Sequence, residues 1–217
     1  QLSDDASWSL HVVRLMIGGK IQNYRNILRR YIRDYGENED INRAVQVLER
    51  AKRDALKAQD KTELIGYEGM ASNAYFEVLP ILILNQKTDF PFHGRNRRPP
   101  KDEVNAMLSF AYTLIANDVA AALETVGLDP YVGFLHTLRP GRTSLALDMM
   151  EELRAYLGDR FILSLINKRQ ISVKDFLFQG DNGVVMTDKG KKTFITAWQA
   201  RKRAVSYTHL RAHETLR

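Results

Sequence analysis

The sequence contains no cysteine among its 217 residues. Neither a disulfide framework nor a thiolate zinc site is therefore available, and a reducing compartment, by default the cytoplasm, is the simplest setting. Long hydrophobic runs are lacking too. The longest, residues 78–84, is interrupted by Pro80 and is much shorter than the about 20 residues that a membrane-spanning helix needs. We therefore expect no membrane association.

Acidic residues are outnumbered by basic ones, 26 against 32, which gives a formal net charge of +6. Such an excess favours an anionic partner, and nucleic acid is the commonest one. Charge alone leaves a basic protein without such a partner equally open. The length, with 44% hydrophobic and 27% charged residues, is typical of one main globular domain.

The first third of the sequence has helical periodicity. Apolar residues recur at helical spacing over residues 8–35, interleaved with basic residues such as Lys20, and predict a long amphipathic helix. Asn38 is a typical cap for a second helix, so the two should form a hairpin. A third helix is expected from Thr62, with Pro80 ending or kinking it.

The middle of the sequence alternates a loop with further helices. Residues 85–100 are polar, basic and proline-bearing, which indicates a loop. Pro99-Pro100 predicts the first turn of a helix that extends to Gly127. Another helix is expected over residues 143–157, where Asp148, Glu151 and Glu152 share one face.

The last third predicts one small β-element and one helix. Two short apolar runs flank a turn-forming Gln-Gly-Asp-Asn-Gly segment, which indicates a hairpin near residues 176–186. Thr187 can cap a final helix that ends near Arg203. The fold class is therefore mainly α.

Three polar groups stand among glycine and apolar residues: Glu68 in Gly-Tyr-Glu-Gly, His136 in Gly-Phe-Leu-His, and Glu151 in Ser-Leu-Ala-Leu-Asp-Met-Met-Glu. Burying such groups is costly unless they are paired, and a shared divalent metal would remove that cost. Carboxylates suit Mg²⁺ and Mn²⁺, and an imidazole favours Mn²⁺. The spacing fits no local metal motif, and each residue alone is more often a hydrogen-bonded structural group. A solvated acidic stripe is the alternative for Asp148 and Glu151.

Four ordered motifs add a resemblance to a known family. Gly-Tyr-Glu-Gly with Ala-Tyr-Phe, Phe-His-Gly-Arg-Asn-Arg-Arg-Pro-Pro-Lys-Asp-Glu, Gly-Leu-Asp-Pro-Tyr-Val-Gly-Phe-Leu-His and Ser-Leu-Ala-Leu-Asp-Met-Met-Glu-Glu-Leu-Arg span residues 66–154. Together they resemble the CRISPR-associated spacer-acquisition endonuclease and integrase, the first Cas protein. The resemblance implies a metal-dependent enzyme that inserts foreign DNA fragments as spacers into a CRISPR array.

The resemblance also implies roles for particular residues. Glu68, His136 and Glu151 match the metal ligands of the family, for Mg²⁺ or Mn²⁺, and Asp148 matches a neighbouring catalytic acid that orients the nucleophile or helps to hold a second ion. The implied partners are DNA, as foreign fragment and CRISPR repeat end, a second copy of the chain in a homodimer, and a small second Cas protein that bridges two dimers.

Basic residues near these motifs are candidates for phosphate binding. The loop around the two prolines carries Arg95, Arg97, Arg98 and Lys101, and Tyr75 is a candidate for stacking on a base or placing a phosphate. The last helix adds further cations, and three polar residues at helical spacing could support the site from behind: Asn105, Ser109 and Tyr112. Bare charge runs are more often solvated surface, and a tyrosine on a buried face is usually core.

Both ends of the chain depart from the family. The N-terminal β-sandwich that family members carry is absent, so residues 1–203 are expected to form the helical nuclease and integrase domain alone. Residues 204–217 resemble translated sequencing adaptor, and we predict a non-native tail there, which removes His209 and His213 from consideration as metal ligands.

Two other functions fit the same composition. In a non-catalytic helical DNA-binding module, the acids and His136 would merely satisfy one another. In a scaffold for protein partners, DNA binding would be no tighter than that of any basic protein.

Overall fold

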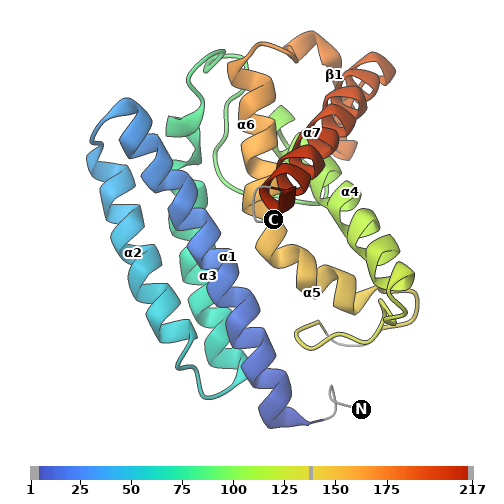
Figure 1. Ribbon diagram of the computed structural model, residues 1–217. Helices are drawn as coiled ribbons and strands as arrows, with labels where there is room; N and C mark the ends of the chain where they lie inside the picture. Colours follow the sequence, from blue (N-terminus) through green and yellow to red (C-terminus); the bar gives the residue numbers. More distant parts are fainter. Residues whose placement is uncertain (1–4, 137–138, 215–217) are drawn as a thin grey trace.

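The computed structural model describes residues 5–136 and 139–214, and side chains up to residue 204 apart from Asn182. The elements in that part of the chain are mainly helical, as predicted (Figure 1). The α-helices are α1 (Ala6–Tyr35), α2 (Glu39–Ala55), α3 (Lys61–Val78), α4 (Glu103–Thr125), α5 (Ser144–Leu153), α6 (Arg160–Asn167) and α7 (Asp188–Glu214). The short elements are 3-10 turns at Leu79–Leu82, Val173–Asp175 and Gly180–Asn182, a π-helical turn at Arg154–Asp159, and the strands β1 (Phe176–Phe178) and β2 (Val184–Met186).

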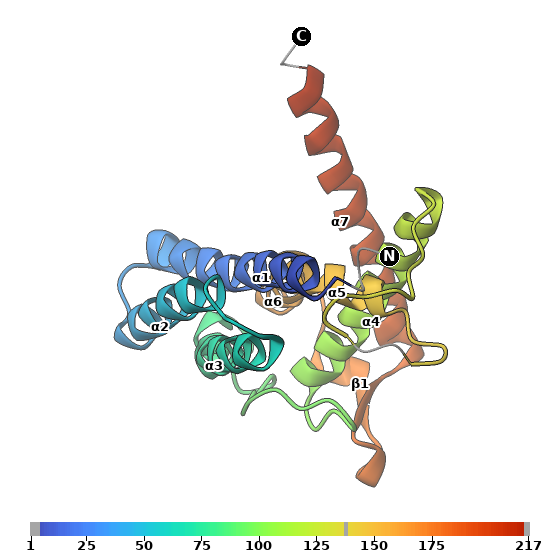
Figure 2. The same cartoon turned by 90° about the horizontal axis from the view of Figure 1, so that it is seen from below.

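Helices α1, α2 and α3 pack side by side, as both views show (Figures 1 and 2). Side-chain caps define where each begins: Asp5 accepts hydrogen bonds at the start of α1, Asn38 at the start of α2 and Asp60 at the start of α3. Gly36, with φ of 93°, ends α1, a conformation that other residues rarely adopt. The helical hairpin predicted for α1 and α2 is confirmed.

Helix α4 is long and apolar enough to cross a membrane by length and composition, with a mean hydropathy of 1.4. Its apolar residues instead join the same core as α1 and α6, and it packs against α5. The expectation that Pro99-Pro100 form its first turn is wrong. The helix begins at Glu103, because the Asp102 carboxylate caps it by accepting a hydrogen bond from the backbone N–H of Asn105 at 2.7 Å.

The predicted hairpin and final helix are both present. Strands β1 and β2 pair antiparallel, with Phe176 opposite Met186. Thr187 caps α7 by accepting a hydrogen bond from the backbone N–H of Gly190 at 3.0 Å. Buried Phe194 and Trp198 of α7 pack edge-on against the ring of Phe161 in α6, which attaches α7 to the core.

The helix expected over residues 143–157 is longer and less regular than predicted. Helix α5 continues through the π-helical turn directly into α6, so one interrupted helical segment spans residues 144–167. A π-helical turn changes which residues share a face, and such turns are frequent at functional sites. Here it turns Arg154 and Asp159 toward the interior, between α1 and α4.

Candidate functional site

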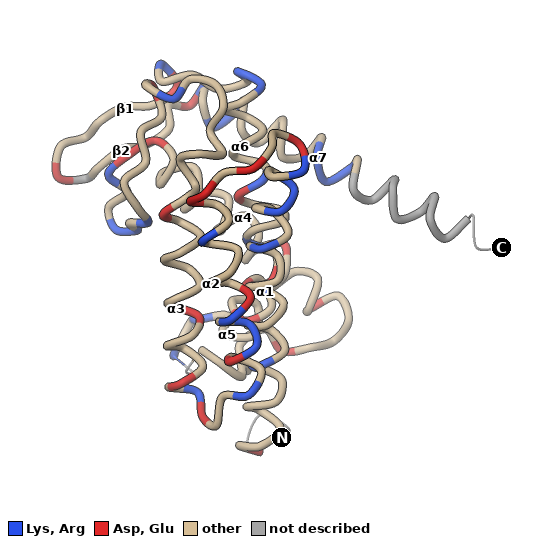
Figure 3. The backbone as a smooth tube through the Cα atoms, turned by 90° about the vertical axis from the view of Figure 1, so that its left-hand side faces the viewer, with Lys and Arg blue, Asp and Glu red and all other residues tan. Residues whose placement is uncertain are grey.

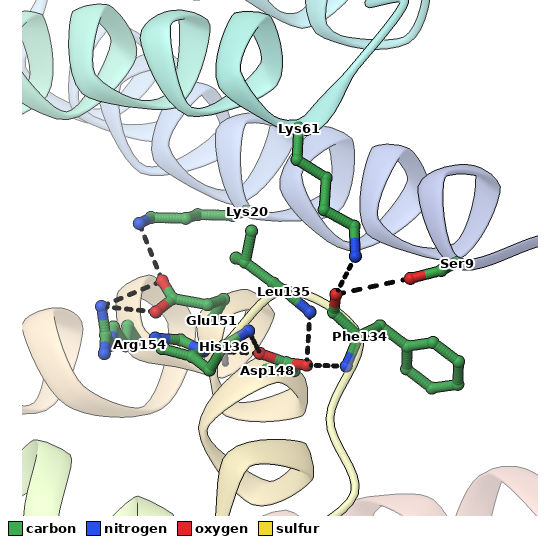
Figure 4. Close-up of polar contacts among 9 residues, drawn as sticks. All are labelled: Ser9, Lys20, Lys61, Phe134, Leu135, His136, Asp148, Glu151 and Arg154. Atoms are coloured by element: carbon green, nitrogen blue, oxygen red, sulfur yellow. Dashed lines mark hydrogen bonds and ion pairs between the residues drawn. The ribbon is translucent and has the colours of Figure 1, made fainter. Parts of the chain in front are cut away.

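Lys20, in the middle of α1, joins two of the predicted site residues. Its Nζ contacts the carboxylate of Glu68 on α3 and, at 2.8 Å, that of Glu151 on α5. The side chains of Lys20 and Glu151 are only 4% and 6% exposed, and that of Glu68 is 25% exposed. The two acids, 83 residues apart in the sequence, thus converge on a single cation position. Figure 4 shows Lys20 reaching down from α1 to Glu151.

The burial of Lys20 was not predicted from the sequence. The periodicity showed Lys20 only as one of the basic residues interleaved in an amphipathic helix, and the structure buries it on the same face as Ile17 and Tyr24. The spacing carries this signal, because residues three and four positions apart lie on one face of a helix. A lysine between two buried apolar positions needs an anionic partner, and here it has two.

Arg154 supplies a second cation to Glu151, at 2.8 Å from Oε1. Burial alone would raise the pKa of Glu151, but Lys20 and Arg154 together lower it below its ordinary value. Burial likewise disfavours the charged form of Lys20, yet Tyr24, Glu151 and Glu68 raise its pKa. Both groups are therefore ionised at neutral pH, and the carboxylate remains available to a cation.

Asp148, one turn before Glu151, holds the loop that carries His136. Its carboxylate accepts hydrogen bonds from three successive backbone N–H groups, those of Phe134 at 2.5 Å, Leu135 at 2.8 Å and His136 at 3.0 Å. It also lies 2.5 Å from Nδ1 of the His136 ring. Asp148 is fully buried, so the solvated acidic stripe is excluded for it.

The same loop is fixed from the other side. The carbonyl oxygen of Phe134 accepts hydrogen bonds from Lys61 at the start of α3, at 2.7 Å, and from Ser9 of α1, at 3.4 Å (Figure 4). Gly133 makes the close approach possible, because a Cβ there would lie 2.8 Å from both Asp148 and the backbone of Ser144. His136 is consequently held by contacts to α1, α3 and α5.

A cavity of about 260 Å³ adjoins Glu68 and Lys20. Besides these two, its charged lining consists of Arg95, Arg97 and Arg154. Arg95 is oriented by hydrogen bonds to Asn105 at 2.7 Å and to Ser109 at 3.2 Å. Four cations against one carboxylate make this cavity suited to an anion such as a phosphate.

The cations and aromatic residues predicted for DNA binding divide into three groups. Arg95 and Arg97 line the cavity beside Glu68, whereas Arg98 and Lys101 are exposed outside it. Tyr75 is fully buried and stacks on Tyr24 with ring centroids 4.0 Å apart. Its assignment to DNA contact is therefore wrong, because no surface of the ring is available to a base. Basic and acidic positions are interspersed along α2, whereas Asp34 is the single acid among the lysine and arginine residues of α1 (Figure 3).

Below this cavity lies a buried polar group that the sequence did not reveal. Asp159 accepts a hydrogen bond from the hydroxyl of Tyr112 at 2.7 Å. Burial raises the pKa of Asp159 to about 6, against the opposing effect of its tyrosine neighbours. Arg154 and Arg95 both lie over the Tyr112 ring, at 5.0 and 5.4 Å from its centroid. Tyr112 thus supports the two arginines from behind, as its spacing in the sequence predicted.

The donors present suit a divalent metal in part. Among the described residues, no three carboxylate or imidazole groups converge closely enough to hold an ion as they stand. Glu68 and Glu151 do share one cation position, which Lys20 takes. His136 offers Nε2, because Nδ1 faces Asp148, and metal-binding histidines commonly have their second ring nitrogen oriented by a carboxylate.

Comparison with solved structures places the fold. A Cas1 protein from Thermotoga maritima matches with a TM-score of 0.80 and 28% identity, over 97% of this chain and 65% of that one. A partial Cas6-RT-Cas1–Cas2 complex matches with a TM-score of 0.83 and 24% identity, over 93% of this chain and 60% of that chain. A casposase bound to an integration product matches with a TM-score of 0.76 and 24% identity, over 92% of this chain and 57% of that chain. The fold is thus that of the helical part of Cas1 proteins and casposase.

Sequence comparison identifies the family. The chain belongs to the CRISPR associated protein Cas1 family, whose model matches residues 1–200. A CRISPR-associated endonuclease Cas1 from Chlorobaculum tepidum is 47% identical over 93% of this chain and 60% of its own length. One from Leptospira interrogans is 43% identical over 93% of this chain and 80% of its own length. The chain therefore spans about 60% of the first relative's length, and the family resemblance read from the motifs is confirmed.

Proposed function

We propose that this chain is the catalytic domain of a metal-dependent DNA endonuclease and integrase that inserts foreign DNA fragments into a CRISPR array. One observation carries the proposal: Glu68 and Glu151, from distant segments, converge on one cation position beside a basic cavity. Phosphoryl transfer requires such an arrangement, because catalysis depends on positioning and on neutralising charge at the phosphate.

Glu68, Glu151 and His136 would hold the metal, Mg²⁺ or Mn²⁺. A divalent ion there would polarise a phosphate oxygen and make a DNA 3′-hydroxyl, or water in hydrolysis, more acidic. Asp148 is a positioning residue on this view, because three backbone N–H groups and the imidazole already occupy its carboxylate. This favours orientation of His136 over the second-ion role for Asp148.

The cationic cavity would bind the phosphate. Arg95 and Arg97 line it together with Lys20, and Arg154 connects it to Glu151. Guanidinium groups match phosphate oxygens with paired hydrogen bonds, and Arg95 is held in place by Asn105. These contacts would place the phosphodiester next to the carboxylate pair.

The partners follow from the same proposal. The similarity in fold to a casposase bound to an integration product supports DNA as the substrate, which we propose to be the foreign fragment and the CRISPR repeat end. The similarity to a structure that contains Cas1 and Cas2 supports a second Cas protein as a partner, and we propose that this small protein bridges two homodimers. Action on a chromosomal array implies the cytoplasm.

The test is strand joining by His136→Ala. The variant should lose joining of a DNA 3′ end to a repeat-containing target by at least 100-fold, because one ligand and its orienting contact are removed. His11→Ala, at an exposed position on α1, is the matched control and should retain activity. Joining by His136→Ala at the control's rate, with an unchanged melting temperature, would contradict the assignment.

One observation favours a second candidate, a non-catalytic DNA-binding module. Lys20 and Arg154 already neutralise Glu68 and Glu151, so the acids have partners without any metal. Mn²⁺ titration followed by thermal unfolding separates the two functions. Stabilisation that disappears in Glu68→Gln and Glu151→Gln supports the enzyme, whereas no stabilisation by Mn²⁺ supports the binding module.

A further inference from the structure

A second basic cavity lies at the C-terminal end of α1, with no lining residue in common with the cavity beside Glu68. It has a volume of about 500 Å³, is open to the surface, and is lined by the last three turns of α1, the 3-10 turn after α3, α6 and α7. Its charged rim includes Arg30, Arg160 and Arg201, and we call it the arginine cavity. Arg30 is ten residues from Lys20, about 15 Å along a helix.

The arginines of this cavity are under-compensated. Asp34 is the single acid of its lining and pairs with Arg30 at 3.2 Å. Among the described residues, neither Arg160 nor Arg201 forms an ion pair with a carboxylate. Nε of Arg201 is buried and has no hydrogen-bond partner within that part of the chain.

Both guanidinium groups are nevertheless fixed in place. Arg160 lies over the ring of Tyr156, 5.2 Å from its centroid, and Arg201 donates a hydrogen bond to the Tyr156 carbonyl oxygen at 3.2 Å. Burial and then the like charge of Arg30 lower the pKa of Arg160, and burial is the main cause of the lowered pKa of Arg201. Cations gathered without counter-charge gain most from an external anion.

We propose that the arginine cavity binds a backbone phosphate of a DNA strand, away from the reacting phosphate. The proposal rests on the proposed function for the identity of the ligand. Fixed, forked donors from α6 and α7 suit phosphate oxygens. Tyr31 and Tyr35, with ring centroids 5.1 Å apart, also line the cavity and offer faces for a sugar or an unpaired base.

A carboxylate-rich peptide is the competing ligand, and the structure favours DNA over it. The cavity combines aromatic faces with three arginines, a combination typical of protein sites that bind single-stranded nucleic acid. Arg30 of the cavity lies about 15 Å along α1 from Lys20, which contacts the carboxylate pair, so one DNA strand could extend from the reaction centre to the cavity.

The test compares two double variants with the same loss of charge. Arg160→Gln/Arg201→Gln removes the proposed contacts, and Arg29→Gln/Arg50→Gln removes two exposed arginines that line neither cavity. Binding of a fluorescent branched DNA is measured by anisotropy between 50 and 300 mM salt. We expect the cavity variant to bind at least tenfold more weakly, with a salt dependence smaller by one to two phosphate contacts, and the control to change by no more than about twofold.

Further arms make each outcome decisive. Arg160→Lys/Arg201→Lys keeps the charge and should recover part of the affinity, which separates lost contacts from misfolding. Stabilisation by Mn²⁺ should remain unchanged in the cavity variant, so failure here is distinct from failure of the metal site. Equal weakening in both double variants would overturn the proposal. So would binding of hexaglutamate, but not of DNA, that depends on Arg160 and Arg201.

Discussion

Replacing Lys20 by methionine tests whether its ammonium stands where the metal would bind. In the wild-type protein, a divalent ion must displace Nζ from both Glu68 and Glu151. Hydrogen-bonded contacts to charged groups contribute about 1.5 kcal/mol each at the lower end, so the two together oppose metal binding by about 3 kcal/mol. Since 1.4 kcal/mol is tenfold in affinity, we expect Lys20→Met to bind Mn²⁺ roughly 100-fold more tightly.

The same substitution should destabilise the protein when no metal is present. Removing one partner of a buried ion pair costs about 3–5 kcal/mol, and Arg154 keeps the loss toward the lower value because it still neutralises Glu151. Added Mn²⁺ should restore the free energy of unfolding. Lys20→Met is therefore expected to be less stable than the wild type without metal and to gain more from it.

Isothermal titration calorimetry with Mn²⁺ measures the affinity, and urea unfolding with and without Mn²⁺ measures the stability. Lys57→Met, at an exposed position, is the control and should change neither. Lys20→Gln provides a milder variant if the methionine protein does not fold. Mn²⁺ binding by Lys20→Met and Lys20→Gln that is equal to or weaker than that of the wild type would refute the reasoning.

Two further predictions concern the surroundings of the site. Burial raises the pKa of Asp159 from about 3.8 in the unfolded chain to about 6 in the folded one. The folded state therefore binds the proton more tightly, and this contribution to stability is complete below about pH 3.8 and is lost as the pH rises to about 6. The unfolding free energy of the wild type should therefore fall between pH 4 and pH 7, and about 3 kcal/mol of that fall should be absent in Asp159→Asn when both are measured by urea unfolding. The same pH profile in the variant and the wild type would contradict the raised pKa of Asp159. Gly133→Ala should lower the unfolding free energy by about 1–3 kcal/mol and weaken strand joining, because its Cβ would press on Asp148. Gly66→Ala, where the added Cβ meets nothing within 4 Å, should be neutral or stabilising, and equal effects of the two alanines would show that crowding at Gly133 is unimportant.

The helices were largely predictable from the sequence because their caps and apolar spacing are local signals. Asn38 and Thr187 cap the helices that they were expected to cap. Pro99-Pro100 misled the prediction for α4, since proline tolerates a first turn but does not create one, whereas the Asp102 carboxylate supplies a partner for a free N–H group. The π-helical turn had no local signal at all.

The site was only partly predictable. The motifs pointed to Glu68, His136, Asp148 and Glu151. The hydrogen bonds by which Asp148 holds the His136 loop, and which distinguish its role from that of the other three, depend on tertiary packing. No role in the site was predicted for Lys20, although its spacing from buried neighbours indicated that it is buried. Tyr75 shows the converse error, because a residue close to a motif in sequence can lie entirely behind it.

The contact of Lys20 with both acids also links two parts of the molecule. Glu68 belongs to the group formed by α1, α2 and α3, whereas Glu151 and Arg154 belong to the segment that continues into α6. A small shift of α1 relative to α5 would therefore change the affinity for a cation without altering any ligand.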